Sequence, residues 1–216
     1  ETQKLVEAYA AELDKELNVV IGKTAGPLDS RRNIVRTQEA AIGNLIADAM
    51  REAVGADIAI TNGGGIRADK EYAAGADITR RDVLTELPFG NVTVLVEATG
   101  QQIWDALENG FSKIEDGAGR FPHVSGLTVV ADVKQAAGKR VVSVMAGGTA
   151  LDLAATYKLA TNDFMLDGGD GYTSLKGGKV LVDPRGAKLM ANDVMALVKK
   201  LGTVDAKVEG RIVIQQ

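Results

Sequence analysis

The chain of 216 residues is 45% hydrophobic, 25% charged and 4% aromatic, and its formal net charge is -4 at pH 7. This acidic balance excludes the extended basic surface with which proteins bind nucleic acid, and no apolar run approaches the roughly 20 residues that cross a membrane. A metal centre built on imidazole or thiolate ligands is not expected either, because the chain has one histidine and no cysteine.

The first part of the chain predicts a separate helix followed by alternating strand and helix. Between Leu5 and Leu17, apolar residues recur every fourth position among charged ones, which is typical of an amphipathic helix with a narrow apolar stripe. A core helix is expected where apolar residues keep helical spacing and a glycine follows them. The elements expected after the first helix are a strand over Val19 to Ile21, a loop over Gly26 to Ser30, a helix over Glu39 to Val54 and a buried strand over Asp57 to Thr61.

The rest of the chain mixes strands and helices without strict alternation. Its expected elements are a helix entered at Asp77 to Thr79 and ending at Leu87, a strand over Val92 to Glu97, a helix over Thr99 to Phe111, a loop over Asp116 to Pro122, paired strands over Leu127 to Ala131 and Arg140 to Val144, a strand over Tyr157 to Asn162, a helix over Asn192 to Leu201 capped by Asn192, and a strand over Val208 to Ile214. We therefore predict an α+β fold, a mixed α/β sheet with flanking helices.

Three glycine-rich loops are candidate ligand-binding segments. They are Asn62 to Arg67, Asp116 to Gly119 and Asp167 to Gly171. Taken singly, each is most simply a tight turn. However, two of the four phenylalanines, Phe89 and Phe164, lie beside glycine-containing loops that also carry Asn91 and Asp170. A planar ligand could stack between two such rings while amide and carboxylate groups read its donors and acceptors.

Three arginines could add an anion-binding element to this group. Arg32 and Arg36 are four residues apart and would face the same way in a helix, and Arg67 ends the first glycine loop. Guanidinium groups suit the bidentate recognition of phosphate or carboxylate, although a solvated basic patch is the alternative reading. His123, which follows a proline, is expected to be a loop or strand-edge side chain and not a catalytic base, because no serine or cysteine elbow accompanies it.

Several motifs, in this order, carry a resemblance to a known family. They are Asn62-Gly-Gly-Gly-Ile-Arg67, Leu87-Pro-Phe-Gly-Asn91 and Asn162-Asp-Phe-Met-Leu-Asp-Gly-Gly-Asp-Gly-Tyr172, with Ile42-Gly-Asn-Leu45 upstream as a fourth. Together they closely resemble the signature of the C-terminal domain of the 5'-nucleotidase family, which includes bacterial periplasmic UDP-sugar hydrolases and animal ecto-5'-nucleotidase. The resemblance runs from about Val19 to Val213.

The resemblance implies substrate-binding roles for eight residues and catalytic roles for none in this chain. A pair of rings would sandwich the nucleobase, polar groups would contact base and ribose, and arginines would reach the ribose or phosphate region. The residues implied are Phe89 and Phe164 for the sandwich, Asn91 and Asp170 for base or ribose, Arg32, Arg36 and Arg67 for ribose or phosphate, and Gly119 for a backbone contact.

The family's catalytic motifs are missing from this sequence. In the family, catalysis belongs to an N-terminal metallophosphatase domain in which Asp, His and Asn residues hold two divalent metal ions. This chain contains no Asp-x-His and no Gly-Asn-His-Asp or Gly-Asn-His-Glu. The resemblance thus implies that residues 1–18 are an interdomain linker helix and that residues 19–216 are the nucleotide-binding domain. By itself this domain is expected to be inactive, with its partner domain in the same polypeptide.

The full protein is accordingly expected to dephosphorylate nucleoside monophosphates. The same base sandwich would also serve a 2',3'-cyclic nucleotide phosphodiesterase or a UDP-sugar hydrolase, and a non-catalytic nucleoside-binding module is an alternative from another class. The ligand would be a nucleotide or nucleoside, with no nucleic acid and no membrane span in this chain. The family also implies a periplasmic, cell-surface or extracellular location.

Overall fold

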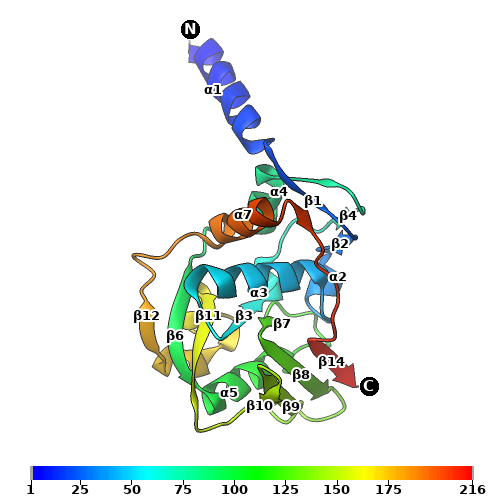
Figure 1. Ribbon diagram of the computed structural model, residues 1–216, viewed down its shortest axis with the longest axis vertical. Coiled ribbons are helices and arrows are strands. Elements are labelled where there is room, and N and C mark those ends of the chain that lie inside the picture. The colour runs from blue at the N-terminus through cyan, green and yellow to red at the C-terminus, as the bar shows by residue number, and fades with distance from the viewer. Residues whose placement is uncertain (1, 216) are drawn as a thin grey trace.

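The centre of the fold is a five-stranded mixed sheet (Figure 1). The computed structural model describes residues 2–215. The strands of this sheet are β3 (Ile58–Asn62), β6 (Thr93–Thr99), β7 (Pro122–Ser125), β11 (Thr156–Asn162) and β12 (Lys179–Val182). Their order is β12-β6-β11-β3-β7, with β3 and β11 parallel and every other neighbour antiparallel.

Helices cover both faces of this sheet. α3 (Ala41–Val54) packs against α7 (Met190–Leu201) on one face, and α5 (Gly100–Phe111) lies in the core of the other. Successive residues of a strand point to opposite faces. In β3, Ile58 and Ile60 join the core that contains α5, whereas Ala59 joins the core that contains α3. The sheet therefore separates two hydrophobic cores.

Smaller elements complete the molecule. A second sheet, in the order β10-β9-β8-β14, contributes to the core around α5. Its strands are β8 (Leu127–Asp132), β9 (Val141–Ala146), β10 (Thr149–Ala150) and β14 (Ile212–Gln215). The remaining helices and strands are α1 (Thr2–Leu17), α2 (Arg32–Val35), α4 (Arg80–Glu86), α6 (Asp163–Leu166), β1 (Val20–Thr24), β2 (Leu28–Asp29), β4 (Glu71–Tyr72), β5 (Asp77–Thr79) and β13 (Thr203–Val204), with short 3₁₀ helices at Gly63–Gly65, Gly169–Gly171 and Thr173–Gly177.

The first helix, α1, projects from the rest of the molecule (Figure 1). Two ion pairs hold its base to the start of α4: Arg80 Nη1 lies 2.9 Å from Glu16 Oε2, and Arg81 Nη2 lies 2.5 Å from Asp14 Oδ1. Leu13, in the middle of the predicted apolar stripe, is 59% exposed. Within residues 2–215, no helix is both long and apolar enough to cross a bilayer.

The structure confirms the α+β prediction and the main helices but corrects several boundaries. Pro122 was assigned to a loop, yet it opens the edge strand β7. Asp77 to Thr79 is a strand, and α4 begins only after Thr79, whose side chain forms a capping box with Asp82. Residues 28 and 29, expected in a loop, pair with β4 as strand β2.

Two further differences have identifiable contacts behind them. Asn192 is not the cap of α7, because the helix begins at Met190, whose N–H donates to Asn91 O at 2.9 Å. The last strand starts at Ile212 instead of Val208. At this start, the Glu39 carboxylate accepts hydrogen bonds from two backbone N–H groups, that of Glu209 before the strand and that of Ile212, its first residue.

Candidate functional site

A cavity of about 360 Å³ lies where several loops meet at the ends of the central strands. This volume falls within the usual range for small-molecule sites. Its lining residues are Arg36, Asn62, Gly64, Gly65, Arg67, Phe89, Asn91, Gly119, Phe164 and Asp170. Seven of the eight residues expected at the site thus line one cavity. The eighth, Arg32, does not line it, and its side chain is exposed.

The floor of the cavity depends on close backbone approaches that need glycine. A Cβ atom on Gly63 would lie 1.9 Å from Val35 O, at the end of α2. Gly64 N donates to Gly119 O at 2.7 Å, and a Cβ atom on Gly64 would lie 2.8 Å from the Gly119 Cα atom. The glycine turn after β3 therefore brings the α2 loop and the loop before β7 to the same place.

Two phenyl rings present apolar surface at the cavity. Phe89 is 61% exposed and Phe164 is 44% exposed, although large aromatic side chains are usually well buried. The Phe164 ring lies directly over Gly169, where a Cβ atom would stand 2.5 Å from the ring. The Arg67 guanidinium lies 5.5 Å from the centroid of the Phe89 ring, within the range of a cation–π contact. Both rings are available to stack on a planar ligand.

Arg36 brings a buried and incompletely paired positive charge to the cavity. Its side chain is 8% exposed, its Nη1 donates to Gly117 O at 3.3 Å, and its buried Nε has no hydrogen-bond partner. Burial and then the charges of Arg32 and Arg67 lower the pKa of the Arg36 guanidinium. Arg32 does not line the cavity, but its charge is close enough to lower the pKa of Arg36. An anion in the cavity would relieve this repulsion.

Asp170 occupies a strained backbone position in the turn Gly169–Gly171. Its φ of 53° lies in the left-handed region, which residues other than glycine seldom adopt. Asn62 Nδ2 donates to Asp170 Oδ2 at 2.8 Å, and Asn109 Nδ2 donates to the Asp170 carbonyl at 3.1 Å. Asn62 was not among the predicted site residues, although its place at the end of β3, just before the glycine loop, was a signal that could have identified it.

The side chain of Asn91 is held by the first residue of α6. Its Nδ2 donates to Asp163 Oδ1 at 2.8 Å, and Asp163 is the first residue of α6. The same carboxylate oxygen accepts from the backbone N–H groups of Val92 at 3.3 Å and Phe164 at 3.0 Å. Asp163 therefore connects the loop that carries Phe89 to the helix that carries Phe164.

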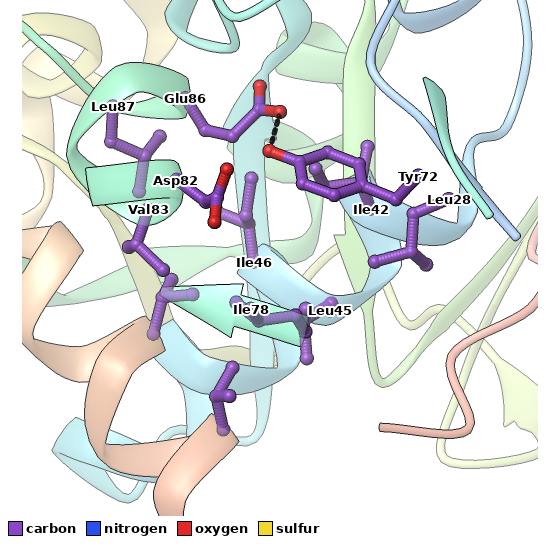
Figure 2. Close-up of a pocket in the computed structure, with 12 residues that line it drawn as sticks. Leu28, Ile42, Leu45, Ile46, Tyr72, Ile78, Asp82, Val83, Glu86 and Leu87 are labelled. Atoms are coloured by element: carbon purple, nitrogen blue, oxygen red, sulfur yellow. Dashed lines mark hydrogen bonds between the residues drawn. The ribbon is translucent and has the colours of Figure 1, made fainter. Parts of the chain in front are cut away.

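The backbone of the loop that carries Arg67 is held by a buried residue, Glu86, through both its carbonyl and its carboxylate. Glu86 is 4% exposed, its carbonyl accepts from Arg67 N at 2.9 Å, and its Oε2 accepts from Ala68 N at 3.1 Å. Figure 2 shows the Tyr72 hydroxyl pointing at the same carboxylate, where it donates to Oε1 at 2.7 Å. Burial raises the pKa of Glu86 against the effect of these hydrogen bonds. The cavity in Figure 2 measures only about 30 Å³ and belongs to the core.

The donor set of this chain does not fit a dinuclear metal centre. His123 is fully buried, and its Nε2 donates to Val35 O at 2.9 Å, so this nitrogen is already used. Among residues 2–215, no three His, Cys, Asp or Glu side chains are grouped so that they could hold a metal ion. His123 lies on edge strand β7, as the strand-edge reading allowed, but in the core and not at the surface.

Comparison with known proteins places this geometry in a family. Residues 20–177 match the family model "5'-nucleotidase, C-terminal domain". The chain is 40% identical over 225 aligned positions to the trifunctional nucleotide phosphoesterase protein YfkN of Bacillus subtilis, covering 98% of this chain and 15% of that protein. It is 33% identical to a snake venom 5'-nucleotidase of Naja atra, covering 89% of this chain and 40% of the relative.

A solved structure agrees with the sequence relatives. The 5'-nucleotidase precursor from Thermus thermophilus superposes with a TM-score of 0.88 and 39% identity, over 98% of this chain and 42% of that one. The chain thus spans less than half the length of these relatives. Because the family model covers most of its residues, the chain belongs to the 5'-nucleotidase family and corresponds to its C-terminal domain.

Proposed function

We propose that the cavity binds a nucleoside or nucleotide, with the base between Phe89 and Phe164 and the phosphate side toward Arg36 and Arg67. One observation carries this proposal: two half-exposed phenyl rings line the same cavity as a buried guanidinium whose Nε has no partner. Rings suit the flat base, and unpaired positive charge suits an anion. We propose that Asn91 and Asp170 contact the base or the ribose, and that Gly119 contacts the ligand through its backbone. Arg32 is proposed to act on the phosphate only through its charge.

For the whole protein, we propose a phosphohydrolase that releases phosphate from nucleoside monophosphates. The relatives named above support this, since two of them are 5'-nucleotidases by name. The two divalent metal ions and the water that they activate are assigned to an N-terminal metallophosphatase domain of the same polypeptide. Residues 1–18 are proposed as the helix that links it to residues 19–216. The name of the venom relative favours a location outside the cytoplasm.

A test of the binding site needs only the 216-residue chain. Calorimetric titration with adenosine, uridine and AMP, without added metal, should give saturable heat in the millimolar range. Stacking is worth about 1–3 kcal/mol per base, so Phe89→Ala and Phe164→Ala should each weaken binding by roughly 5- to 100-fold. Val142→Ala removes an exposed apolar side chain elsewhere, on β9, and serves as the control. Unchanged affinity in both phenylalanine variants would refute the base sandwich.

A second test addresses catalysis. The 216-residue chain, supplied with AMP and divalent metal ions, should release no phosphate, and clear turnover would contradict the assignment of chemistry to another domain. A broader substrate range is a second candidate function, because the Bacillus relative is named a trifunctional phosphoesterase. Rates of the full-length protein on AMP, a 2',3'-cyclic nucleotide and a UDP-sugar would separate these activities. Full-length protein that binds nucleosides but hydrolyses none would indicate a non-catalytic module.

A further inference from the structure

The contact between Asp163 and Asn91 determines which atom Asn91 can offer to a ligand. An ionised carboxylate accepts hydrogen bonds and donates none. The group of Asn91 that lies 2.8 Å from Asp163 Oδ1 must therefore be its NH₂ group. The carbonyl oxygen Oδ1 of Asn91 is then turned away from Asp163, and in the described part of the chain it accepts no side-chain or backbone hydrogen bond. Asn91 lines the cavity, and Oδ1 is the polar atom of its side chain that these contacts leave without a partner.

The other amide side chain at the cavity, that of Asn62, has no unpaired end. Asn62 uses its Nδ2 on Asp170 at 2.8 Å, and its Oδ1 accepts from Asn162 Nδ2 at 3.1 Å. Both ends of the Asn62 amide are thus paired within the protein. Of the two amide side chains that line the cavity, Asn91 is the one with an unpaired end, and that end is an acceptor.

We propose that Asp163 is a positioning residue that fixes Asn91 as a hydrogen-bond acceptor, and that the cavity therefore recognises a nucleobase by a donor on its edge. The amino group of adenine or cytosine and the ring N–H of uracil are such donors. This inference rests on the proposed function, because it takes a nucleobase as the ligand. It adds a selection rule: a base without any edge donor leaves the Asn91 oxygen unpaired and binds more weakly.

Asp163 is well placed for this role because its own position is fixed. Its backbone N–H donates to Val92 O at 3.2 Å, while its carboxylate accepts from Val92 N. These contacts tie α6 to the residue next to Asn91. Asn91 in turn lies two residues after Phe89. The same aspartate thus sets both the direction of the amide and the register between the two ring-bearing segments.

The first experiment compares adenosine with purine riboside on the 216-residue chain by calorimetry. Purine riboside lacks the 6-amino group and carries no donor on its base, but it stacks over a similar area. A neutral hydrogen bond is worth about 0.5–1.5 kcal/mol, so adenosine should bind about 2- to 13-fold more tightly. Equal affinities would overturn the inference and leave the proposed function standing. Failure of both nucleosides to bind would overturn the proposed function, and the inference with it.

Variants at position 163 test whether the aspartate sets the preference. In Asp163→Ala the amide is free to turn, so the adenosine preference should fall toward one. Asp163→Asn should retain most of the preference, because its carbonyl can still accept from Asn91 Nδ2. Asp167→Ala removes an exposed carboxylate from the end of the same short helix and should leave the preference unchanged. An aspartate that only stabilised the loops would change both affinities together and not their ratio.

The test at position 163 requires that each variant is folded. Thermal unfolding of each variant shows whether Asp163→Ala remains folded at the temperature of titration. If it does not, Asn91→Ala carries the test: its adenosine affinity should fall, and the preference for adenosine over purine riboside should fall toward one. A preference that persists in a folded Asp163→Ala variant, or in Asn91→Ala, would overturn the proposal.

Discussion

The imidazole of His123 donates from Nε2 to the carbonyl oxygen of Val35 at 2.9 Å, and Val35 is the residue before Arg36. The ring is fully buried, and its other nitrogen, Nδ1, has no hydrogen-bond partner. It lies against Gly43 of α3, where a Cβ atom would stand 2.1 Å from Nδ1. The single histidine of the chain therefore supports the cavity from within the core.

This burial predicts a pH dependence of stability. Loss of hydration lowers the pKa of His123 to about 4 from an ordinary value of 6.5, although the contact with Val35 and the charge of Glu39 oppose it. Between these values the unfolded chain binds a proton that the folded chain does not. The free energy of unfolding should therefore fall as the pH drops from 6.5 to 4, by up to about 3 kcal/mol from this group.

Urea unfolding at several pH values in this window checks the prediction. His123→Gln can still donate to Val35 but does not titrate, so its stability should change less with pH than that of the parent. Aspartates and glutamates titrate in both proteins, and the difference between the two profiles removes their contribution. Parallel profiles would show that His123 does not take up the proton on unfolding.

Two of the three glycines after β3, Gly63 and Gly65, should differ in how much stability their substitution by alanine costs. In Gly63→Ala the new methyl group would lie 1.9 Å from Val35 O, so the α2 loop must move, at a cost of about 1–3 kcal/mol. In Gly65→Ala the nearest atom, Asn62 Oδ1, is at an ordinary 3.6 Å, and stability should change by less than about 1 kcal/mol. Chemical denaturation of both variants measures this difference. Equal losses would contradict the close approach at Gly63.

Much of this fold could be predicted from local patterns, and the errors have a common cause. The helix that became α3 was found because apolar spacing and Gly55 act locally. Asn192 was taken for a cap because asparagine favours that position, but α7 begins where the chain contacts Asn91. The strand β7 was missed because the glycine-rich, polar segment from Asp116 to Pro122 suggested a loop, whereas Pro122 opens the strand, and an edge strand tolerates proline. Contacts between distant segments decided both cases.

The site was predictable to a similar degree. The glycines, phenylalanines and arginines of the site could be recognised in the sequence. Their spacing also suggested that Arg32 and Arg36 act side by side, but in the structure only Arg36 of these two lines the cavity. α2 ends at Val35, so Arg36 leaves the helix and turns into the cavity while Arg32 stays exposed. The role of Asp163 was not visible either, because its hydrogen bond to Asn91 spans 72 positions.

Arg36→Gln should raise the thermal stability of the free chain and lower its affinity for AMP. The substitution removes a buried charge that Arg32 and Arg67 repel, so the free chain should melt at a higher temperature. AMP affinity should fall by about tenfold or more, since hydrogen bonds to charged groups are the stronger ones, while adenosine should lose less. Arg185→Gln, at a 92% exposed side chain, is the matched control and should alter neither property. If Arg36→Gln binds AMP as the parent does, the phosphate does not lie near this guanidinium.

The hydroxyl of Tyr72 should contribute more to the free energy of unfolding at pH 8 than at pH 4. Burial holds the pKa of Glu86 above its ordinary value, and the hydrogen bond from Tyr72 is the largest of the contacts that lower it. In Tyr72→Phe the folded pKa of Glu86 should rise further. A raised folded pKa gives stability that is present below the ordinary carboxyl pKa and is lost as the pH rises through the folded value. The substitution should thus cost little at pH 4 and about 1–3 kcal/mol at pH 8.

Urea unfolding at the two pH values measures this difference. Tyr157→Phe is a suitable control because the Tyr157 hydroxyl accepts from a backbone N–H, that of Asp152, at 3.0 Å, and its loss should cost the same at both pH values. In a Glu86→Gln background the effect of Tyr72→Phe should also become independent of pH, since no carboxylate is left to ionise. A loss that is equal at pH 4 and pH 8 in the parent background would mean that Glu86 stays in one protonation state throughout. Because the Glu86 carboxylate also accepts from Ala68 N, next to Arg67, the AMP affinity of Tyr72→Phe relative to that of the parent should fall as the pH rises.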